Sequence, residues 1–441
     1  MYMTLTPLKY FEALYPENTR EKEIRQYLEF LKKGLSAQII GLPGTGKNNL
    51  LRLLAYNIDA RTYHLKHYEN TVHFVYIDSA EAKNRPPKDL IKLIMSSIAF
   101  SLGERSLLDE AKRINLFLAE GINMNDEFLM FQYLKKAIDF LTIEKKLSVI
   151  LLFDRFDTIA PSLTEEFFSS LKTLRNHAKY RFGVVFSLKR PLEETVDIEL
   201  ISDFSDIISK NEIYIQLVDD VAIKFRTEYI EKAARNSIDK KVRDEILSLC
   251  GGHAKLTKLS FEKIVSEKDK ISDVKNYLLN QETIIKALDE IWDSLLPSEK
   301  IELKNKTFSD NSYLTKTGLV KDNEIAIPLF SYYIESLNIE NNEKIYYDLE
   351  KNDILKGNIS ISSTLSSSEF RLLKYMLENI DKILTKDEII TAVWNDQKTQ
   401  EGVTDQAFDQ IIYRLRKKIE ANPSDPKFIV TVKGTGYKFV S

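Results

Sequence analysis

Residues 37–57 read AQIIGLPGTGKNNLLRLLAYN, and this stretch decides the fold of the first half of the chain. Its apolar start predicts a short strand over Ala37–Ile40, and the apolar spacing after Lys47 predicts a helix to about Asn57. Residues 41–47 between them fit the phosphate-loop pattern G-x-x-x-x-G-K in the strand–loop–helix context that this pattern requires. Glycines let the backbone turn sharply round a phosphate, which then meets the loop N–H groups and the helix N-terminus. The residues expected to bind ATP or ADP here are Gly41, Pro43, Gly44, Thr45, Gly46, Lys47, Asn48 and Asn49.

The metal-binding positions around this loop depart from the usual pattern. A Ser or Thr hydroxyl normally binds Mg²⁺ directly after the loop lysine, but this chain has Asn48 there. Residues 149–154, VILLFD, predict an apolar strand ending in Asp154, a carboxylate that would hold Mg²⁺ through the nucleotide. Arg155 follows, and an arginine cannot act as the base that activates water, which leaves Asp154 and Asp157 as catalytic candidates. We therefore expect nucleotide binding with weak or altered use of Mg²⁺, and slow hydrolysis if ATP is hydrolysed at all.

Further strands are predicted around this first one. The apolar runs at residues 72–77, 148–153, 182–188 and 213–217 are separated by helical segments. This alternation predicts an α/β fold with a mostly parallel sheet covered on both faces. Later segments read as helices broken at Gly251-Gly252, a compact helical unit with a short hairpin near 319–327, and a polar linker at 338–344. The expected domains are residues 1–218, 219–270, 271–340 and 345–441.

The last hundred residues carry a second pattern. LSSSEFRLL (365–373) and LTKDEIITAVW (384–394) predict helices with Ser and Thr caps, and a third helix is predicted from Asp405 to Glu420. Apolar residues at 408, 412, 415 and 419 of the third helix should pack inward and leave a polar and basic stripe elsewhere. Residues 428–439 predict a hairpin turning at 434–436. Residues 414–438 hold seven Lys or Arg against two acidic residues, in a chain of net charge −3, which favours nucleic-acid binding here.

Residues of about 15–340 resemble the STAND branch of AAA+-like P-loop ATPases, near the archaeal-type ATPases and the origin-recognition initiators. The resemblance rests on TREKE (19–23), GLPGTGK (41–47), VILLFDRFD (149–157) and GGHA (251–254), where the family usually has proline in place of Ala254. It implies a nucleotide-binding domain, a helical lid, and a winged helix over YLTKTGLV (313–320) and IAIPLFSYYI (325–334). It also implies that Arg20 and His253 lie near the nucleotide.

The pattern from LSSSEFRLL to FIVTVKGTGYKFV (428–440) resembles the OmpR/PhoB effector domain over nearly its whole length. The resemblance implies a winged helix-turn-helix that binds double-stranded DNA. The family's DNA-contacting positions fall on Tyr413, Arg414, Arg416 and Lys417 in the recognition helix, and on Thr431, Lys433, Thr435 and Tyr437 in the wing. Residues 395–402 match the loop that touches RNA polymerase in some members. The family normally carries a phosphorylatable receiver domain in front, and here an ATPase-like module takes that place.

Length and composition agree with this interpretation. The chain has 441 residues and a single cysteine, which suggests several domains, no internal disulfide and a cytoplasmic location. It contains no run of about 18 uncharged apolar residues, so no membrane span is expected. We interpret the chain as a nucleotide-controlled DNA-binding protein, a transcription regulator with an ATP-binding STAND-type switch. RNA polymerase and a second copy of the chain are further candidate partners. Three alternatives stay open: an ATP-dependent DNA remodeller or initiator, a STAND-type sensor in antiphage defence, and a structural protein with an inactive phosphate loop.

Overall fold

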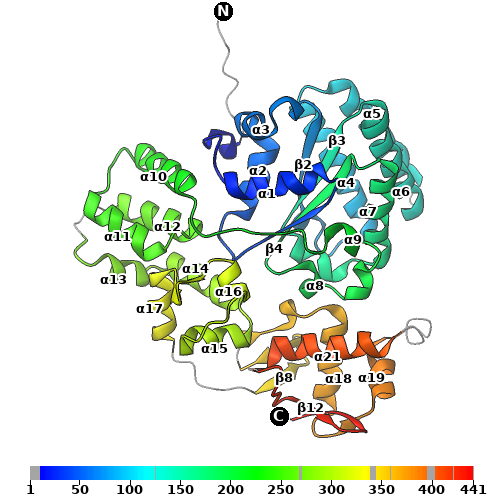
Figure 1. Cartoon of the computed structure of the whole chain (residues 1–441), viewed down its shortest axis with the longest axis vertical. Helices are drawn as coiled ribbons and strands as arrows, with labels where there is room; N and C mark the ends of the chain where they lie inside the picture. Colours follow the sequence, from blue (N-terminus) through cyan, green and yellow to red (C-terminus); the bar gives the residue numbers. More distant parts are fainter. Residues whose placement is uncertain are drawn as a thin grey trace, which may run out of the picture.

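The structure of the chain is a computed structural model that describes residues 10–124, 126–267, 271–337, 344–357, 359–394, 403–420 and 422–440. Figure 1 shows a sheet wrapped by helices at the N-terminal side, a helical part beside it, and a small C-terminal domain next to both. Among the helices of these described ranges, none combines the length and the apolar composition that crossing a bilayer requires.

A five-stranded parallel sheet forms the centre of the N-terminal part. Its strands lie in the order β2-β3-β4-β1-β5. They are β1 (Ala37–Ile40), β2 (Val72–Asp78), β3 (Ser148–Asp154), β4 (Phe182–Leu188) and β5 (Glu212–Tyr214). The phosphate loop follows β1, and β4 lies between β1 and the acidic strand β3, which is the arrangement of the AAA+-like P-loop fold. The predicted parallel sheet is confirmed. Because the carboxyl ends of parallel strands meet at one edge, the phosphate loop, Asp154 and the residues after β4 share that edge.

Helices cover both faces of the sheet, because side chains of each strand alternate between the faces. In β3, Ile150 and Leu152 join the core on one face, whereas Leu151 and Phe153 join the core on the other. The first face carries α1 (Glu21–Lys32), α2 (Lys47–Tyr56) and α3 (Ile58–Leu65). The second carries α4 (Pro87–Glu104), α5 (Leu108–Met124), α6 (Glu127–Asp139) and α7 (Glu165–His177). The short helices α8 (Leu192–Thr195) and α9 (Ser205–Ile208) follow β4.

The helical part packs round one apolar core. Its elements are α10 (Asp220–Ala234), α11 (Lys240–Cys250), α12 (Ala254–Val265), α13 (Val274–Leu279), α14 (Glu282–Asp293), α15 (Pro297–Asn305), α16 (Tyr313–Lys316), the hairpin β6 (Val320–Lys321) and β7 (Glu324–Ile325), and α17 (Pro328–Ser336). Leu256, Trp292 and Phe330 share this core with Leu42 of the phosphate loop and with Leu217. Residues on both sides of position 270 contribute to it, so these helices form one packed unit attached to the loop.

The C-terminal domain has a core of its own. Its elements are β8 (Ile345–Asp348), β9 (Asp353–Lys356), β10 (Ile359–Ser360), α18 (Ser367–Glu378), β11 (Ile383–Leu384), α19 (Lys386–Val393), α21 (Asp405–Ile419), β12 (Ile429–Val432) and β13 (Gly436–Phe439). The predicted Ser and Thr caps at Ser366 and Thr385 are confirmed, and both are capping boxes; the antiparallel hairpin β12–β13 that forms the wing is confirmed as well. The sheet β10-β9-β8 in front of α18 was not predicted. Every buried apolar residue of the core cluster comes from residues 345–439.

Candidate nucleotide site and nucleic-acid interface

The phosphate loop is held with its carbonyl groups bonded to the protein. Five consecutive carbonyl oxygens accept hydrogen bonds of 2.6–3.0 Å. The donors, in loop order, are Lys47 for Gly41 and Leu42, His253 for Pro43, the Lys255 N–H for Gly44, and Arg20 for Thr45. Carbonyls engaged in this way do not face an anion, which leaves the loop suited to phosphate binding through its N–H groups.

Arg20 and His253, both implied by the ATPase resemblance, lie directly against the loop. His253 is fully buried, and its Nδ1 accepts from the Leu256 N–H at 3.2 Å, so its Nε2 carries the proton that the Pro43 carbonyl accepts. Burial lowers the pKa of His253 to about 4, which keeps the ring neutral. Arg20 is 7% exposed and donates to the carbonyl of Gln216 at 2.7 Å as well as to the loop. The structure therefore places both side chains as supports of the loop backbone.

The loop lysine lies in a buried environment beside the predicted carboxylates. Burial lowers the pKa of Lys47 to about 8, and the charges of Asp157 and Asp154 partly oppose this effect. Asp154 is 2% exposed and accepts from the Tyr76 hydroxyl at 2.8 Å, and burial raises its pKa. Asp157 follows β3 and pairs with Lys189, just after β4, at 3.7 Å. The two catalytic candidates thus lie on the same side of the loop as the Lys47 ammonium.

The groups that could hold Mg²⁺ fit that ion in kind. Asp154 offers a buried carboxylate, and Asn48 offers an exposed amide at the start of α2, and both are hard oxygen ligands. The position after Asp154 holds no base, because it is an arginine. The Arg155 guanidinium pairs with Asp78 through both nitrogens that face it. In the parts of the chain that the structure describes, no group of three or more His, Cys, Asp or Glu is placed to hold a metal by itself. A metal here would need the nucleotide as a further ligand.

A cavity of about 210 Å³ opens beside the loop. Its wall is largely apolar and includes Tyr15, Leu53, Leu217 and Ile223. Its polar lining comes from the loop and the start of α2, and from charged side chains of the surrounding elements, which include Arg20, Asp219, Arg226, Lys255 and Lys258. An apolar wall next to a phosphate loop suits a flat base whose phosphates extend toward the loop.

The recognition helix α21 places its two faces as the spacing predicted. Phe408, Ile412, Leu415 and Ile419 are at most 2% exposed and belong to the core of the domain. On the outer face Tyr413 is 57% exposed, with Gln406 and Gln410 exposed beside it. The wing residues Thr431, Lys433 and Thr435 are exposed, and Tyr437 is half-buried.

Arg416 joins the recognition helix to the wing. Its guanidinium donates to the Ile429 carbonyl at 2.6 Å and to the Thr431 hydroxyl at 2.7 Å, and it lies 5.8 Å from the Tyr437 ring centroid. Arg416 therefore fixes the angle between α21 and β12. The predicted polymerase loop, residues 395–402, lies outside the described residues.

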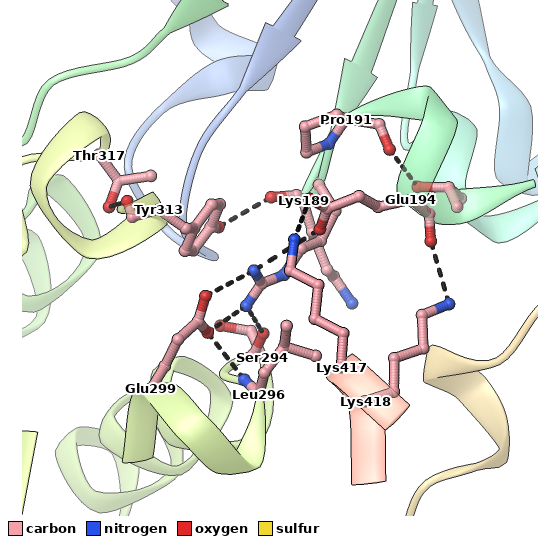
Figure 2. Close-up of polar contacts among 12 residues, drawn as sticks. Lys189, Pro191, Glu194, Ser294, Leu296, Glu299, Tyr313, Thr317, Lys417 and Lys418 are labelled. Carbon is pink, nitrogen blue, oxygen red and sulfur yellow. Dashed lines mark hydrogen bonds and ion pairs between the residues drawn. The ribbon is translucent and has the colours of Figure 1, made fainter. Parts of the chain in front are cut away.

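The basic end of α21 contacts the P-loop part of the chain (Figure 2). Lys417 Nζ donates to the Glu194 carboxylate at 2.7 Å, and Lys418 Nζ donates to the Glu194 carbonyl at 3.0 Å. Arg414 pairs with Asp197 at 3.5 Å. Sequence reasoning missed Glu194 and Asp197, because no local pattern links a loop after β4 to a helix about two hundred residues further on.

A buried ion cluster lies beneath this contact. Glu369, fully buried at the start of α18, accepts from Lys418 at 2.6 Å and from Arg414 at 3.0 Å. Burial opposes ionisation of Glu369, but Lys418 and Arg414 outweigh burial and hold its pKa below the ordinary value. Lys418 falls on the apolar face of α21, between Leu415 and Ile419. A charge at that position was the sequence signal that could have revealed the cluster.

The fold and the two sites define the class of the protein: an AAA+-like P-loop module joined to a winged DNA-binding domain. Residues 362–439 match the family described as "Transcriptional regulatory protein, C terminal", and this C-terminal domain is of the OmpR/PhoB type. The sensory transduction protein RegX3 of Mycobacterium leprae is 37% identical over 94 residues, which are 21% of this chain and 45% of that protein. The chain thus spans less than half the length of this curated relative.

Two solved structures match parts of the chain. The DNA-binding domain of RstA from Klebsiella pneumoniae, in complex with the RstA box, is 24% identical with a TM-score of 0.19, and the match covers 24% of this chain and 98% of that one. The Walker-type ATPase of Pyrococcus abyssi is 16% identical with a TM-score of 0.45, and the match covers 75% of this chain and 99% of that one.

Proposed function

We propose that the chain is a nucleotide-controlled DNA-binding protein that acts as a transcription regulator in the cytoplasm. The observation that carries this proposal is that one chain joins a phosphate loop with a half-buried lysine to an OmpR/PhoB-type domain whose recognition helix touches the P-loop part. When two binding domains are in contact, occupancy of one site can change the affinity of the other. Two domains on a flexible tether would only raise each other's local concentration.

At the first site the ligand is ATP or ADP. The loop N–H groups and Lys47 bind the phosphates, the apolar wall with Tyr15 receives the base, and Arg20 and His253 keep the loop in shape. Asp154 and Asn48 are the residues that would hold a Mg²⁺, which would supply positive charge against the phosphates. Hydrolysis is slow, because Arg155 stands where a base is usual and is held by Asp78, which leaves Asp157 to orient water.

At the second site the ligand is duplex DNA. RstA was solved with its DNA box, and the matching domain of this chain exposes Tyr413 on the helix and Thr431, Lys433 and Thr435 on the wing. In this proposal the recognition helix enters the major groove and the wing contacts the backbone. Arg414, Lys417 and Tyr437 extend that surface, and Arg416 holds its two parts together. RNA polymerase at residues 395–402 and a second copy of the chain are the further partners that this function would use.

The test is reciprocal linkage in the full chain. A duplex is first selected in vitro from a random pool, and its affinity is measured with and without saturating ATP or ADP. Nucleotide affinity is then measured with and without that duplex. We expect equal ratios in the two directions, typically 5- to 150-fold for a coupling of about 1–3 kcal/mol.

Lys47→Ala provides the control, because it removes the loop cation and leaves the C-terminal domain unchanged. This variant should lose nucleotide binding and keep the DNA affinity of the nucleotide-free protein. Ratios of one in both directions in the wild type would show that the two halves merely share a chain, and would refute nucleotide control.

A further inference from the structure

A short segment connects the nucleotide edge of the sheet to the recognition helix. Residues 189–197 begin at the end of β4 and include α8. At the start, Lys189 pairs with Asp157, whose charge acts on Lys47. At the far end, Glu194 and Asp197 contact the C-terminal domain, and Figure 2 shows Glu194 between Lys417 and Lys418. The 189–197 segment therefore runs from Asp157, whose charge acts on the loop lysine, to the recognition helix.

The contact covers one end of the polar stripe on α21. The stripe runs through residues 406, 410, 413, 414 and 417, and its last position is Lys417, which is bonded to Glu194. Arg414 within the stripe is only 12% exposed, because Glu369 and Asp197 surround its guanidinium. A DNA backbone lying along the whole stripe would meet the carboxylates of the 189–197 segment, and the negative phosphates and carboxylates would repel each other.

The start of α18 contributes a second set of contacts to the same segment. Asp197 accepts from the hydroxyls of Ser366 at 2.6 Å and Ser368 at 2.8 Å. Ser367 donates to the carbonyl of Pro161 at 2.9 Å. The helix that supports α21 is thus held to the P-loop part together with α21, so the C-terminal domain docks as one body.

The contacts that the 189–197 segment makes with the C-terminal domain are polar. The apolar core of the C-terminal domain lies wholly within residues 345–439, and the contacts described above are ion pairs and hydrogen bonds. The Lys417–Glu194 pair is 39% and 29% exposed, so water readily replaces a lost partner there, whereas the Arg414–Asp197 pair is nearly buried at 12% and 13% and holds the boundary more firmly. A cavity of about 380 Å³ also lies along this boundary, lined by Asp157, Lys189, Glu194 and Lys418 among others.

We infer that the 189–197 segment is a lock on the DNA-binding surface: Glu194 and Asp197 occupy Lys417 and Arg414 in place of DNA phosphates. Full seating of α21 on a duplex then requires the C-terminal domain to leave this segment. The inference rests on the proposed function for its DNA site, and it adds which carboxylates restrain that site. Because Lys189 belongs to the same segment, a nucleotide that displaces the Lys189–Asp157 pair can shift the lock.

The first test removes the two charges and keeps the shape. The full chain with Glu194→Gln and Asp197→Asn is compared with wild type for binding a mixed-sequence duplex at low salt. We expect an affinity gain of about fivefold or more, the lower end of typical coupling. Glu199→Gln is the matched control, since it removes one exposed carboxylate two residues beyond the segment. Equal affinities of the double variant and the wild type would overturn the lock.

The second test traps the docked state. Pro161→Cys and Ser367→Cys place two thiols at positions that are in contact, since the Ser367 hydroxyl donates to the backbone carbonyl of Pro161 at 2.9 Å; the native Cys250 is buried and does not compete. The oxidised, cross-linked chain should bind the duplex at least about fivefold more weakly than the same chain after reduction. Equal binding in the two redox states would overturn the lock.

The cross-link also separates failure of the lock from failure of the proposed function. If no form of the chain binds any duplex, DNA binding itself is refuted. The rate of cross-linking then still reports the docked contact: slower cross-linking when Glu194→Gln and Asp197→Asn are added supports the carboxylate contact, and an unchanged rate overturns it.

Discussion

Arg190→Ala should loosen the helical part from the sheet. The Arg190 guanidinium donates to Glu299 at 2.7 Å and to the Ser294 carbonyl at 3.1 Å, and lies 3.8 Å from the centroid of the Tyr313 ring. The Arg190 and Glu299 side chains are 13% and 8% exposed, so truncation leaves a nearly buried carboxylate without its counter-ion. Breaking a buried pair costs about 3–5 kcal/mol, and we take about 3 because some water reaches this one.

A loss of about 3 kcal/mol corresponds to roughly a 150-fold change in an opening equilibrium. Hydrogen exchange measured by mass spectrometry on peptides from α15 and α16 should therefore accelerate by up to that factor. Arg190→Lys should fall in between, because lysine keeps the charge but cannot make the forked contact. Arg243→Ala is the control, since it removes an ion pair with Glu231 inside the helical part. Exchange within twofold of wild type in Arg190→Ala would refute the reasoning.

Three further outcomes are expected. A phosphate beside Lys47 should raise the pKa of this lysine from about 8, so at pH 9 Lys47 should take up close to one proton when nucleotide binds. Nucleotide affinity should then weaken as the pH rises further. Calorimetric binding heats that do not depend on the buffer at pH 9 would contradict this. Lys433→Ala should weaken binding to all duplexes alike and reduce the salt slope by about one, whereas Lys240→Ala on α11 should leave both unchanged. Gly251→Ala should destabilise the helical part by about 2 kcal/mol or more, as measured by thermal unfolding. Gly251 itself has φ +54, and an added Cβ would lie 1.8 Å from a carbonyl oxygen beside the hairpin. Gly103→Ala is the control and should be neutral or stabilising, because its Cβ would meet nothing within 4 Å.

Local patterns predicted the elements and their inward faces. The continuous apolar run of β3 and the helical spacing of Phe408 and Leu415 both report burial, so the parallel sheet and the orientation of α21 followed from the sequence. Contacts between distant segments could not be predicted in this way. Glu194 lies on a short helix, and nothing in the neighbouring sequence indicates that its partners are Lys417 and Lys418. Where a charged side chain meets a remote one, the sequence shows both charges but not their proximity.

The same limit applied at the nucleotide site. The glycine pattern located the loop, and the resemblance placed Arg20 and His253 near it. It did not indicate that both side chains would bond to the loop's own carbonyls. The pairing of Arg155 with Asp78 was equally hidden, since it depends on β2 and β3 lying in register at their carboxyl ends.

The carbonyl groups of the phosphate loop are hydrogen-bonded to Lys47, to Arg20 and to the helical part, so the loop needs no ligand to keep its shape. The entropic cost of ordering this loop is incurred when the chain folds, so the free energy of nucleotide binding does not include it. The rate of capture is then set by diffusion into the cavity and by the turning of one lysine side chain, both much faster than loop folding. For the proposed nucleotide control, this means that the loop would keep its binding shape between release of one nucleotide and capture of the next.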